Sequence, residues 1–439
     1  MKPFAQRLEE LKTKYAHNQL TLIGKALMDK GVESMWEIDS RILGRGHKKW
    51  RKKAKRFSQE YIKPYAKQAD IDPDSFDHTK LFKEAAKQGF LSAMVPKPIG
   101  STGIDWGFKN LSFSTVLMAE EFAAVDGGLA LKLLAPNLGV SSLWLSGDIR
   151  MIFRKAIPMY MGSTWFGKTK TMAYAITESS AGSDVEDELG GANARLGTSA
   201  KKVKGGFVLN GSKVFISNGA IADAVAVFTK LEGEGRESFT CFYIEKGTKG
   251  FSVGKHEKKL GQRASDASEL ILDNVFVPDE DVIGKVRGGW AINKSVLMQS
   301  RIPVGAMALG HARGAFENAL AFTKKEYIGN KKMITFQEVQ MELAQMVQEL
   351  WSIRSFLWNT SNLTKIPLSM SASTKAYASD ASYGICNRAM ELMGDDGYLH
   401  NNNTERFWRD VRLTQIYEGT NQINRLGIVE NHEETDFKR

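Results

Sequence analysis

The sequence predicts an α+β protein in which a helical region, a β-rich middle and a helical bundle follow one another. Hydrophobic residues recur at mostly helical spacing up to about residue 170, with a period of two from about 171 to 283, and again with a period of 3.6 from about 284. We therefore expect an N-terminal helical extension (1–44), an N-terminal helical domain (45–170), a middle β-domain (171–283), a C-terminal helical bundle domain (284–432) and a tail (433–439).

The N-terminal region contains a strongly basic run, residues 47–57 (HKKWRKKAKRF). Trp50, Ala54 and Phe57 are spaced by four and three residues, which is typical of a helix that packs these residues inward and leaves the charges in water. An alternative reading is a contact surface for nucleic acid, an anionic membrane or an acidic protein. Because no nucleic-acid motif accompanies the run, we expect no nucleic-acid partner.

The middle region predicts short consecutive strands. Residues 202–204, 207–209 and 213–216 alternate in hydrophobicity and are separated by Gly205-Gly206 and Asn210-Gly211, which are typical of tight hairpin turns. Further strands are expected at residues 224–229, 239–245 and 275–278.

The C-terminal region predicts a bundle through one long apolar stripe with alternating spacings of four and three residues. The stripe consists of Val339, Leu343, Met346, Leu350, Ile353 and Leu357.

Composition restricts the class of protein. The chain has 439 residues, 42% hydrophobic and 25% charged, with a net charge of +10; this length suggests roughly two to four domains. We find no signal-peptide pattern and no apolar run of about 18 residues, so no membrane span is expected. Cys241 and Cys386 lie in apolar patterns typical of buried thiols. These features favour a cytoplasmic protein, and we expect no metal site.

Residues 416–422 (IYEGTNQ) are the strongest chemical signal. They place the carboxylate of Glu418 beside an aromatic ring and a Gly-Thr turn, where desolvation raises a carboxylate's pKa and basicity. Gly419 lets the backbone approach a ligand, and Thr420 and Gln422 can form hydrogen bonds with it. An ordinary helix start with a Glu near its N-terminus is the competing interpretation.

Residues 174–185 (YAITESSAGSDV) predict a strand that runs into a loop rich in hydroxyls and small side chains. Such a loop can surround a polar planar ligand with backbone N–H and hydroxyl donors. It is neither a dinucleotide-binding glycine motif nor a P-loop, and an ordinary Ser/Gly turn remains the alternative.

Five stretches taken together resemble the acyl-CoA dehydrogenase flavoprotein family. In family order they are residues 174–185, 214–219, 260–266, 274–278, and Arg409-Asp410 leading into 416–422. The resemblance covers roughly residues 45–430. It implies the same fold, with an N-terminal helical domain, a middle β-domain and a C-terminal four-helix bundle.

The resemblance also implies a reaction. Glu418 would remove the α-proton of an acyl-CoA thioester, while the β-hydrogen passes as hydride to N5 of bound FAD. Electrons would then pass to an electron-transfer flavoprotein, and the expected assembly is a homotetramer built as a dimer of dimers. Because Ser300 stands where some family members carry the base, Glu418 has no rival.

Site residues follow from the matched positions. The resemblance implies FAD contacts from Tyr174, Ile176, Thr177, Ser183, Phe215, Ser217, Lys325, Gln337, Thr420 and Gln422. It implies substrate contacts from Ser183, Arg301, Tyr417 and Gly419.

Two segments depart from the family pattern. Lys325 replaces an arginine that reaches a neighbouring subunit's FAD, and it offers no bidentate fork. Asp395 and Asp396 replace a glycine-rich stretch near the cofactor's pyrophosphate, where carboxylates repel phosphate unless they point away.

Other functions stay open within this reading. An acyl-CoA oxidase or a decarboxylating dehydrogenase can share the fold, and a weakly catalytic relative could bind nucleic acid or a membrane through the basic run. The acyl group itself is not defined by the sequence.

Overall fold

A computed structural model describes residue 6 and residues 42–101, 111–187 and 194–430. The predicted extension 1–44 lies outside the described residues except for residue 6 and residues 42–44, and the tail 433–439 lies outside them entirely. The helices of the N-terminal region are α4 (Arg45–Phe57), α5 (Lys63–Ile71), α6 (Thr79–Lys87), α7 (Leu111–Ala123), α8 (Gly127–Leu145), α9 (Ile149–Met151) and α10 (Ile157–Phe166). The π turns Ser58–Ile62 and Ile152–Ala156 join α4 to α5 and α9 to α10.

The basic run forms α4 as predicted. Trp50, Ala54 and Phe57 are buried, while the intervening lysines are mostly exposed. Trp50 Nε1 donates a hydrogen bond to the Ser114 carbonyl at 2.9 Å, which fixes the helix against α7. The inward-packing interpretation is therefore confirmed, and Arg51 is the one basic side chain of the run that is buried with them.

Helix α8 is long and apolar enough to cross a membrane by length and composition alone. Two-thirds of its residues are buried inside the structure, where Leu129, Leu133 and Leu143 contact the core. This burial is typical of a central helix in a water-soluble fold.

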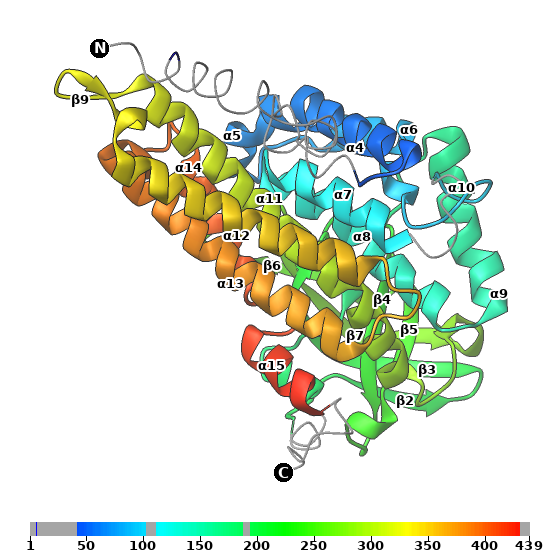
Figure 1. Cartoon of the computed structure of the whole chain (residues 1–439). Helices are drawn as coiled ribbons and strands as arrows, with labels where there is room; N and C mark the ends of the chain where they lie inside the picture. The colour runs from blue at the N-terminus through cyan, green and yellow to red at the C-terminus, as the bar shows by residue number, and fades with distance from the viewer. Residues whose placement is uncertain (1–5, 7–41, 102–110, 188–193, 431–439) are drawn as a thin grey trace.

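The middle region is one eight-stranded sheet with the order β6-β7-β3-β2-β4-β5-β8, and β1 pairs with β4. Its strands are β1 (Met172–Ala175), β2 (Ser199–Val203), β3 (Gly206–Ser217), β4 (Ala224–Leu231), β5 (Thr240–Glu245), β6 (Phe251–His256), β7 (Ala267–Pro278) and β8 (Val282–Ile283). The sheet has its own apolar core and lies below the helical layers in Figure 1.

One predicted turn was wrong. Asn210-Gly211 does not end a strand but lies inside the continuous strand β3, where the register with β7 shifts between Leu209 and Gly211. Gly211 has φ 131°, and Asn210 Oδ1 accepts a hydrogen bond from Asn274 N of β7 at 2.8 Å. An Asn-Gly pair satisfies a β-bulge as readily as a hairpin, because both need a residue with positive φ.

The C-terminal region contains three long helices, α11 (Gly289–Lys325), α12 (Gln337–Ser361) and α13 (Leu368–Met393), which lie side by side in Figure 1. Helix α14 (Thr404–Thr414) packs on α11 and α13, and α15 (Asn421–Glu430) packs on α13. The hairpin β9 (Tyr327–Ile328) and β10 (Lys331–Lys332) joins α11 to α12. All six residues of the predicted apolar stripe on α12 are buried.

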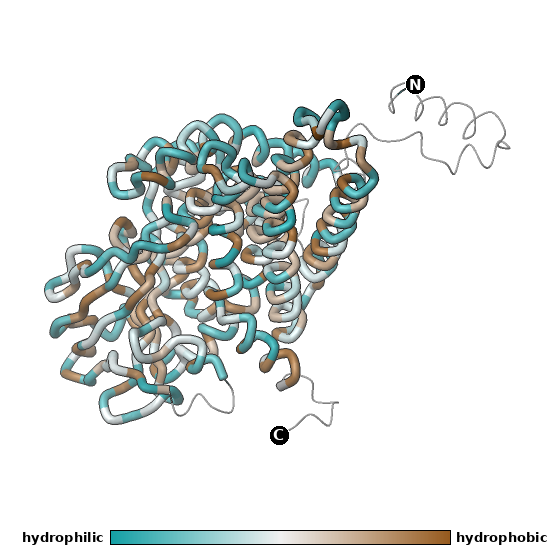
Figure 2. The backbone as a smooth tube through the Cα atoms, turned by 90° about the vertical axis from the view of Figure 1, so that its left-hand side faces the viewer, coloured by the Kyte–Doolittle hydropathy of each residue, from teal (hydrophilic) through white to brown (hydrophobic). Residues whose placement is uncertain are grey.

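A single hydrophobic core joins both helical regions, with members from α4, α6, α7 and α8 as well as from α11 to α14. Hydrophobic segments also concentrate in the strands of the sheet, whereas hydrophilic segments cover much of the outside (Figure 2). Cys241 and Cys386 are buried free thiols, as predicted.

Candidate active site

Glu418 lies in the loop between α14 and α15, in a left-handed backbone conformation. Its φ is 55° and that of the following Gly419 is 78°. For a residue with a side chain this conformation costs roughly 1–2 kcal/mol, so the surrounding structure must hold it. The predicted turn is thus present, and a glycine occupies its second position.

Three helices hold this loop by hydrogen bonds to its carbonyls. Arg301 Nε of α11 donates to the Glu418 carbonyl at 3.1 Å. Lys375 Nζ of α13 and Asn424 Nδ2 of α15 donate to the Gly419 carbonyl at 2.7 and 2.8 Å. Bonds from three separate elements leave the backbone of Glu418 little freedom.

Among the described residues, Ser300 is the side chain that binds the Glu418 carboxylate: its Oγ donates a hydrogen bond to Oε2 at 2.5 Å. Burial raises the pKa of Glu418 above its ordinary 4.5, although Ser300, Arg301 and Lys375 act in the opposite direction. A desolvated carboxylate with a raised pKa is a stronger base than a surface glutamate. This result confirms the desolvation that the sequence predicted.

Two charged residues at the site were missed. Glu186 Oε2 lies 2.8 Å from Arg301 Nη2, and burial raises the pKa of Glu186 despite that partner. Burial, assisted by Arg301, lowers the pKa of Lys375 to about 7. Each carried a signal in the sequence: Glu186 follows Ser183 by three residues, and Lys375 stands among the small residues that form the buried face of α13.

The loop 174–185 connects Glu418 to strand β3. The Thr420 N–H donates to Ser183 Oγ at 3.1 Å, and the Val214 N–H donates to the Thr177 carbonyl at 2.9 Å. Tyr174 Oη donates to Asn293 Oδ1 of α11 at 2.5 Å. The structure therefore brings together residues from three of the motifs that are far apart in the chain.

Phe215 is an exposed aromatic side chain in the body of the sheet. Its backbone has φ 59°, next to a register shift of β3 against β7, and the residue is 58% exposed. Thr177, Ser183 and Ser217 are half-buried hydroxyls, and a side chain added at Gly182 would meet open space. An aromatic face, hydroxyl donors and an open backbone approach fit a planar cofactor with polar edges, as the resemblance implied for FAD.

Of the expected cofactor residues, Lys325 and Gln337 lie apart from this group, whereas Gln422 lies on the helix that follows the Glu418 loop. The Lys325 side chain is 85% exposed, and its Nζ lies 3.8 Å from Oε1 of the neighbouring Glu326, which is a long ion pair. Gln337 is exposed at the start of α12; both lie beside the β9–β10 hairpin, at the end of the bundle remote from α15 in Figure 1. Gln422 is exposed on α15 itself.

Of the remaining expected residues, Tyr417 and Gly419 flank Glu418, and Arg301 binds its carbonyl. Ile176 is half-buried in the loop after β1. Tyr417 Oη accepts a hydrogen bond from Gln262 Nε2 at 3.1 Å, so this hydroxyl is already engaged by the protein. Arg301 is almost fully buried and donates a hydrogen bond to the Glu418 carbonyl.

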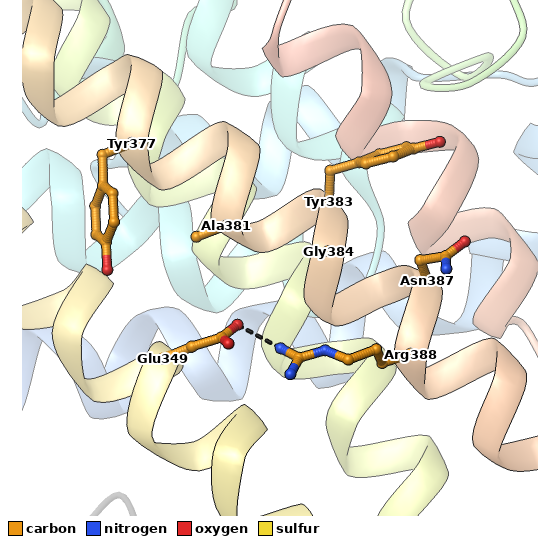
Figure 3. A pocket seen from close by; sticks show the side chains of 7 residues that line it. All are labelled: Glu349, Tyr377, Ala381, Tyr383, Gly384, Asn387 and Arg388. Atoms are coloured by element: carbon orange, nitrogen blue, oxygen red, sulfur yellow. Dashed lines mark hydrogen bonds and ion pairs between the residues drawn. The ribbon is translucent and has the colours of Figure 1, made fainter. Parts of the chain in front are cut away.

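A pocket of about 630 Å³ on the outside of the bundle is a separate feature. Its lining comes from α12 and α13 and consists of Glu349, Tyr377, Ala381, Tyr383, Gly384, Asn387 and Arg388. Figure 3 shows the ion pair between Glu349 and Arg388 across it. It shares no residue with the site around Glu418, and we assign it no part in the chemistry.

Family models match three consecutive parts of the chain. These are the acyl-CoA dehydrogenase N-terminal domain over residues 45–149, the middle domain over 173–275 and the C-terminal domain over 287–432. In the described ranges, no group of three or more His, Cys, Asp or Glu residues could hold a metal ion.

Individual relatives and solved structures agree with these models. A 3-(aryl)acrylate reductase of Clostridium sporogenes is 31% identical over 88% of this chain and 98% of its own length. An acyl-CoA dehydrogenase of Bacillus subtilis is 32% identical over 86% and 95%.

The structure of butyryl-CoA dehydrogenase from Megasphaera elsdenii is similar with a TM-score of 0.79 and 30% identity, covering 88% of this chain and 97% of that one. A chain in the structure described as electron transferring flavoprotein of Acidaminococcus fermentans is similar with a TM-score of 0.81 and 29% identity, covering 90% and 99%.

Proposed function

The chain belongs to the acyl-CoA dehydrogenase family, and we propose that it forms a trans-2,3 double bond in an acyl-CoA thioester with Glu418 as the α-proton base. The family consists of flavoprotein oxidoreductases with FAD as cofactor, and the chain is such an enzyme acting on acyl-CoA.

The observation that carries the proposal is the constrained, desolvated carboxylate of Glu418. An α-C–H is a very weak acid, so its removal needs a base of raised pKa and donors that stabilise the developing negative charge on the thioester oxygen. Arg301, Lys375 and Asn424 bind the loop's carbonyls, which leaves the carboxylate to act on substrate. Ser300 orients the carboxylate through the 2.5 Å hydrogen bond to its Oε2.

When FAD is bound, it would accept the hydride that leaves the β-carbon of the substrate. In this proposal Phe215 provides an aromatic surface for it, and Thr177, Ser183, Ser217 and Thr420 provide polar contacts. Exclusion of water from the Glu418 carboxylate by substrate and cofactor would further increase its basicity.

We propose a homotetramer, with an electron-transfer flavoprotein as the electron acceptor. The exposed position of Lys325 at the end of α11 supports the assembly, because the resemblance implies that this position reaches the FAD of a neighbouring subunit. The likeness to a chain in an electron transferring flavoprotein structure supports the acceptor. The buried free thiols favour the cytoplasm as the site of action.

The decisive test replaces Glu418 by a side chain of similar size and shape that cannot act as a base. Glu418→Gln should retain FAD but reduce the flavin with acyl-CoA at least about 100-fold more slowly, since loss of a general base typically costs 10²–10⁴ in rate. The measurement is stopped-flow bleaching of the flavin. Glu349→Gln, in the separate pocket, is the matched control and should bleach at the normal rate.

Undiminished bleaching in Glu418→Gln would reject Glu418 as the base. A panel of acyl-CoAs with straight, branched, cyclic and dicarboxylic acyl groups, tested by the same bleaching, then identifies the substrate class. Hydrogen peroxide formed without an acceptor protein would instead indicate the oxidase alternative.

The likeness to a 3-(aryl)acrylate reductase favours one second candidate, the same chemistry in the reverse direction. A protonated Glu418 would then deliver a proton to the α-carbon of an unsaturated acyl group, which its raised pKa also favours. Oxidation of the pre-reduced enzyme by an aryl-acryloyl thioester, faster than its reduction by a saturated acyl-CoA, would support this direction.

A further inference from the structure

The helical run from α9 to α10 presents apolar side chains to solvent. Ile149, Phe153, Met161 and Trp165 lie at multiples of four residues and are joined at the end of α10 by Phe166, and their exposed fractions range from 37% for Met161 to 74% for Phe166. Residues four apart lie on one side of a helix. These five exposed side chains are here named the α10 face; the helical run that carries them, from α9 to α10, lies along the outer right-hand edge of Figure 1.

The side chains of the α10 face do not contribute to the hydrophobic core beneath this helical run. The opposite side of the same run already buries Met151, Ala156, Met159 and Tyr160 against the rest of the protein. A helix that is apolar on both sides, with one side in water, loses free energy unless something covers that side. The surface is thus a candidate interaction site and not a consequence of packing.

Positive charge surrounds the aromatic end of the face. Lys168 Nζ lies 5.8 Å from the centre of the Phe166 ring, and Trp165 Nε1 donates to the Pro98 carbonyl at 2.8 Å, next to exposed Lys97. Helix α6 packs on α10 and brings exposed Lys87, which is paired with Glu84 at 2.8 Å, alongside Gly167.

The lysines of α4 extend this charge. Lys53 Nζ of α4 donates a hydrogen bond to the Gln88 carbonyl at 2.5 Å, next to Lys87 of α6. Burial, and after it repulsion from Arg56, Lys97 and Lys49, lowers the pKa of Lys53. The basic run that the sequence singled out therefore continues into the aromatic end of the α10 face.

The other end of the face is electrically balanced. Arg150 pairs with Asp148 at 3.1 Å, Arg154 with Glu280 at 3.2 Å, and Lys155 with Glu245 at 3.0 Å. At the end that carries Trp165 and Phe166, Lys97 and Lys168 have no acidic partner among the described residues.

We propose that the α10 face rests on an anionic lipid bilayer surface, with Trp165 and Phe166 in the headgroup region and the lysines on anionic headgroups. A stretch of exposed Ile, Phe, Met and Trp side chains bordered by lysines is the pattern of interfacial helices. A second copy fits less well, because a symmetric contact through this face would set lysines against lysines. An acidic protein or nucleic acid would neutralise the lysines but would not cover the exposed apolar side chains of Ile149 and Phe153.

The test uses the FAD-loaded full chain and co-sedimentation with vesicles of phosphatidylcholine, with and without phosphatidylglycerol. Wild-type protein should sediment with the anionic vesicles and be released by high salt. The double variant Trp165→Ser, Phe166→Ser should bind at least about tenfold more weakly, given that burial of even a few apolar groups dominates interfacial affinity. Lys97→Glu with Lys168→Glu should remove the preference for anionic vesicles.

Phe276→Ser is the matched control, because Phe276 is an exposed aromatic on strand β7 and not on α4, α6 or α10. It should bind vesicles as the wild type does, and flavin bleaching by acyl-CoA should be normal in every variant, so this test is independent of the proposed reaction. Absence of binding to anionic vesicles, or unchanged binding by the aromatic double variant, overturns the proposal. If the aromatic double variant instead changes its oligomeric state on gel filtration, the face belongs to a contact with a second copy. If its only defect is slower electron transfer to an acidic flavoprotein, the face belongs to a protein partner.

Discussion

At the scale of single residues, the chemistry of this protein is concentrated on Glu418 and the groups that set its pKa. Burial raises that pKa, and Ser300 is the first of the groups that act against burial. From the sequence, Ser300 stands out only because it occupies the position where some family members carry the base. The structure makes it a direct partner of the base, because the turn of α11 and the loop after α14 meet at this point.

Ser300→Ala should shift the pH dependence of the reaction. Without the donated hydrogen bond the pKa of Glu418 rises further, so a higher pH is needed to ionise the base, and the acidic limb of kcat/KM moves to higher pH. A hydrogen bond to a charged group is worth about 1.5–3 kcal/mol, which corresponds to about one to two pH units at most. The measurement is the pH profile of flavin bleaching by acyl-CoA.

Ser295→Ala on the same helix is the control, because the Ser295 hydroxyl donates to the Ala291 carbonyl one turn earlier in α11 and not to Glu418. Its profile should coincide with that of the wild type. An acidic limb of Ser300→Ala that stays in place, or moves to lower pH, would contradict the assigned role of the Ser300 hydroxyl.

At the scale of elements, strand β3 shows where local pattern was insufficient. Its sequence contains two glycine turns by pattern, yet only Gly205 lies in a hairpin turn, whereas Gly211 forms a bulge within the strand. The difference depends on β7, which pairs with both halves of β3 and makes one long strand. The same strand carries Phe215 to the candidate cofactor surface, so its irregularities position a functional residue.

The two glycines should respond differently to alanine. At Gly211 an added Cβ would lie 2.7 Å from Thr198 Cα in addition to the cost of φ 131°, whereas at Gly205, with φ 79°, it would meet open space. Gly205→Ala should lower the free energy of unfolding by about 1 kcal/mol. Gly211→Ala should lower it by at least about 2 kcal/mol, because backbone strain and a backbone clash add.

Chemical denaturation of the two variants measures this difference. Equal losses in both would indicate that the bulge is free to relax. A Gly211→Ala protein with normal stability would show that β3 is not continuous through this position.

At the scale of the whole molecule, the N-terminal helices and the bundle behave as one packed unit joined by buried charge. Glu120 Oε1 on α7 lies 2.7 Å from Arg313 of α11 and 2.7 Å from Arg354 of α12. Arg51 of α4 reaches Glu121 at 2.8 Å. Burial alone would raise the pKa of Glu120, but the combined attraction of these three arginines holds it well below its ordinary 4.5.

Glu120→Gln should be strongly destabilising. Removal of one partner of a buried ion pair leaves uncompensated charge and typically costs about 3–5 kcal/mol. Because the folded pKa of Glu120 is depressed, its contribution is complete above the ordinary carboxyl pKa and is lost as the pH falls through the folded value. The wild type should therefore lose more stability than Glu120→Gln on acidification below about pH 4.

Glu234→Gln is the matched control, since the Arg287–Glu234 pair has the same 2.7 Å distance but is largely exposed. That variant should remain within about 1 kcal/mol of the wild type. Equal effects of the two variants in urea denaturation would show that the buried network does not hold the helical regions together.

The sequence by itself determined the order of helical, β and helical regions, the buried stripe of α12, the inward face of α4 and the desolvated Glu418. These depend on local period and on short motifs, which a chain carries regardless of its long-range contacts. Only the tertiary structure decided that Asn210-Gly211 is a bulge, that Glu186 and Lys375 lie beside the base, that Ser300 binds it, and that Trp165 and Phe166 face outward. Each of these depends on which distant elements meet, because pairing partners, burial and local charge are properties of the packed chain and not of any one segment.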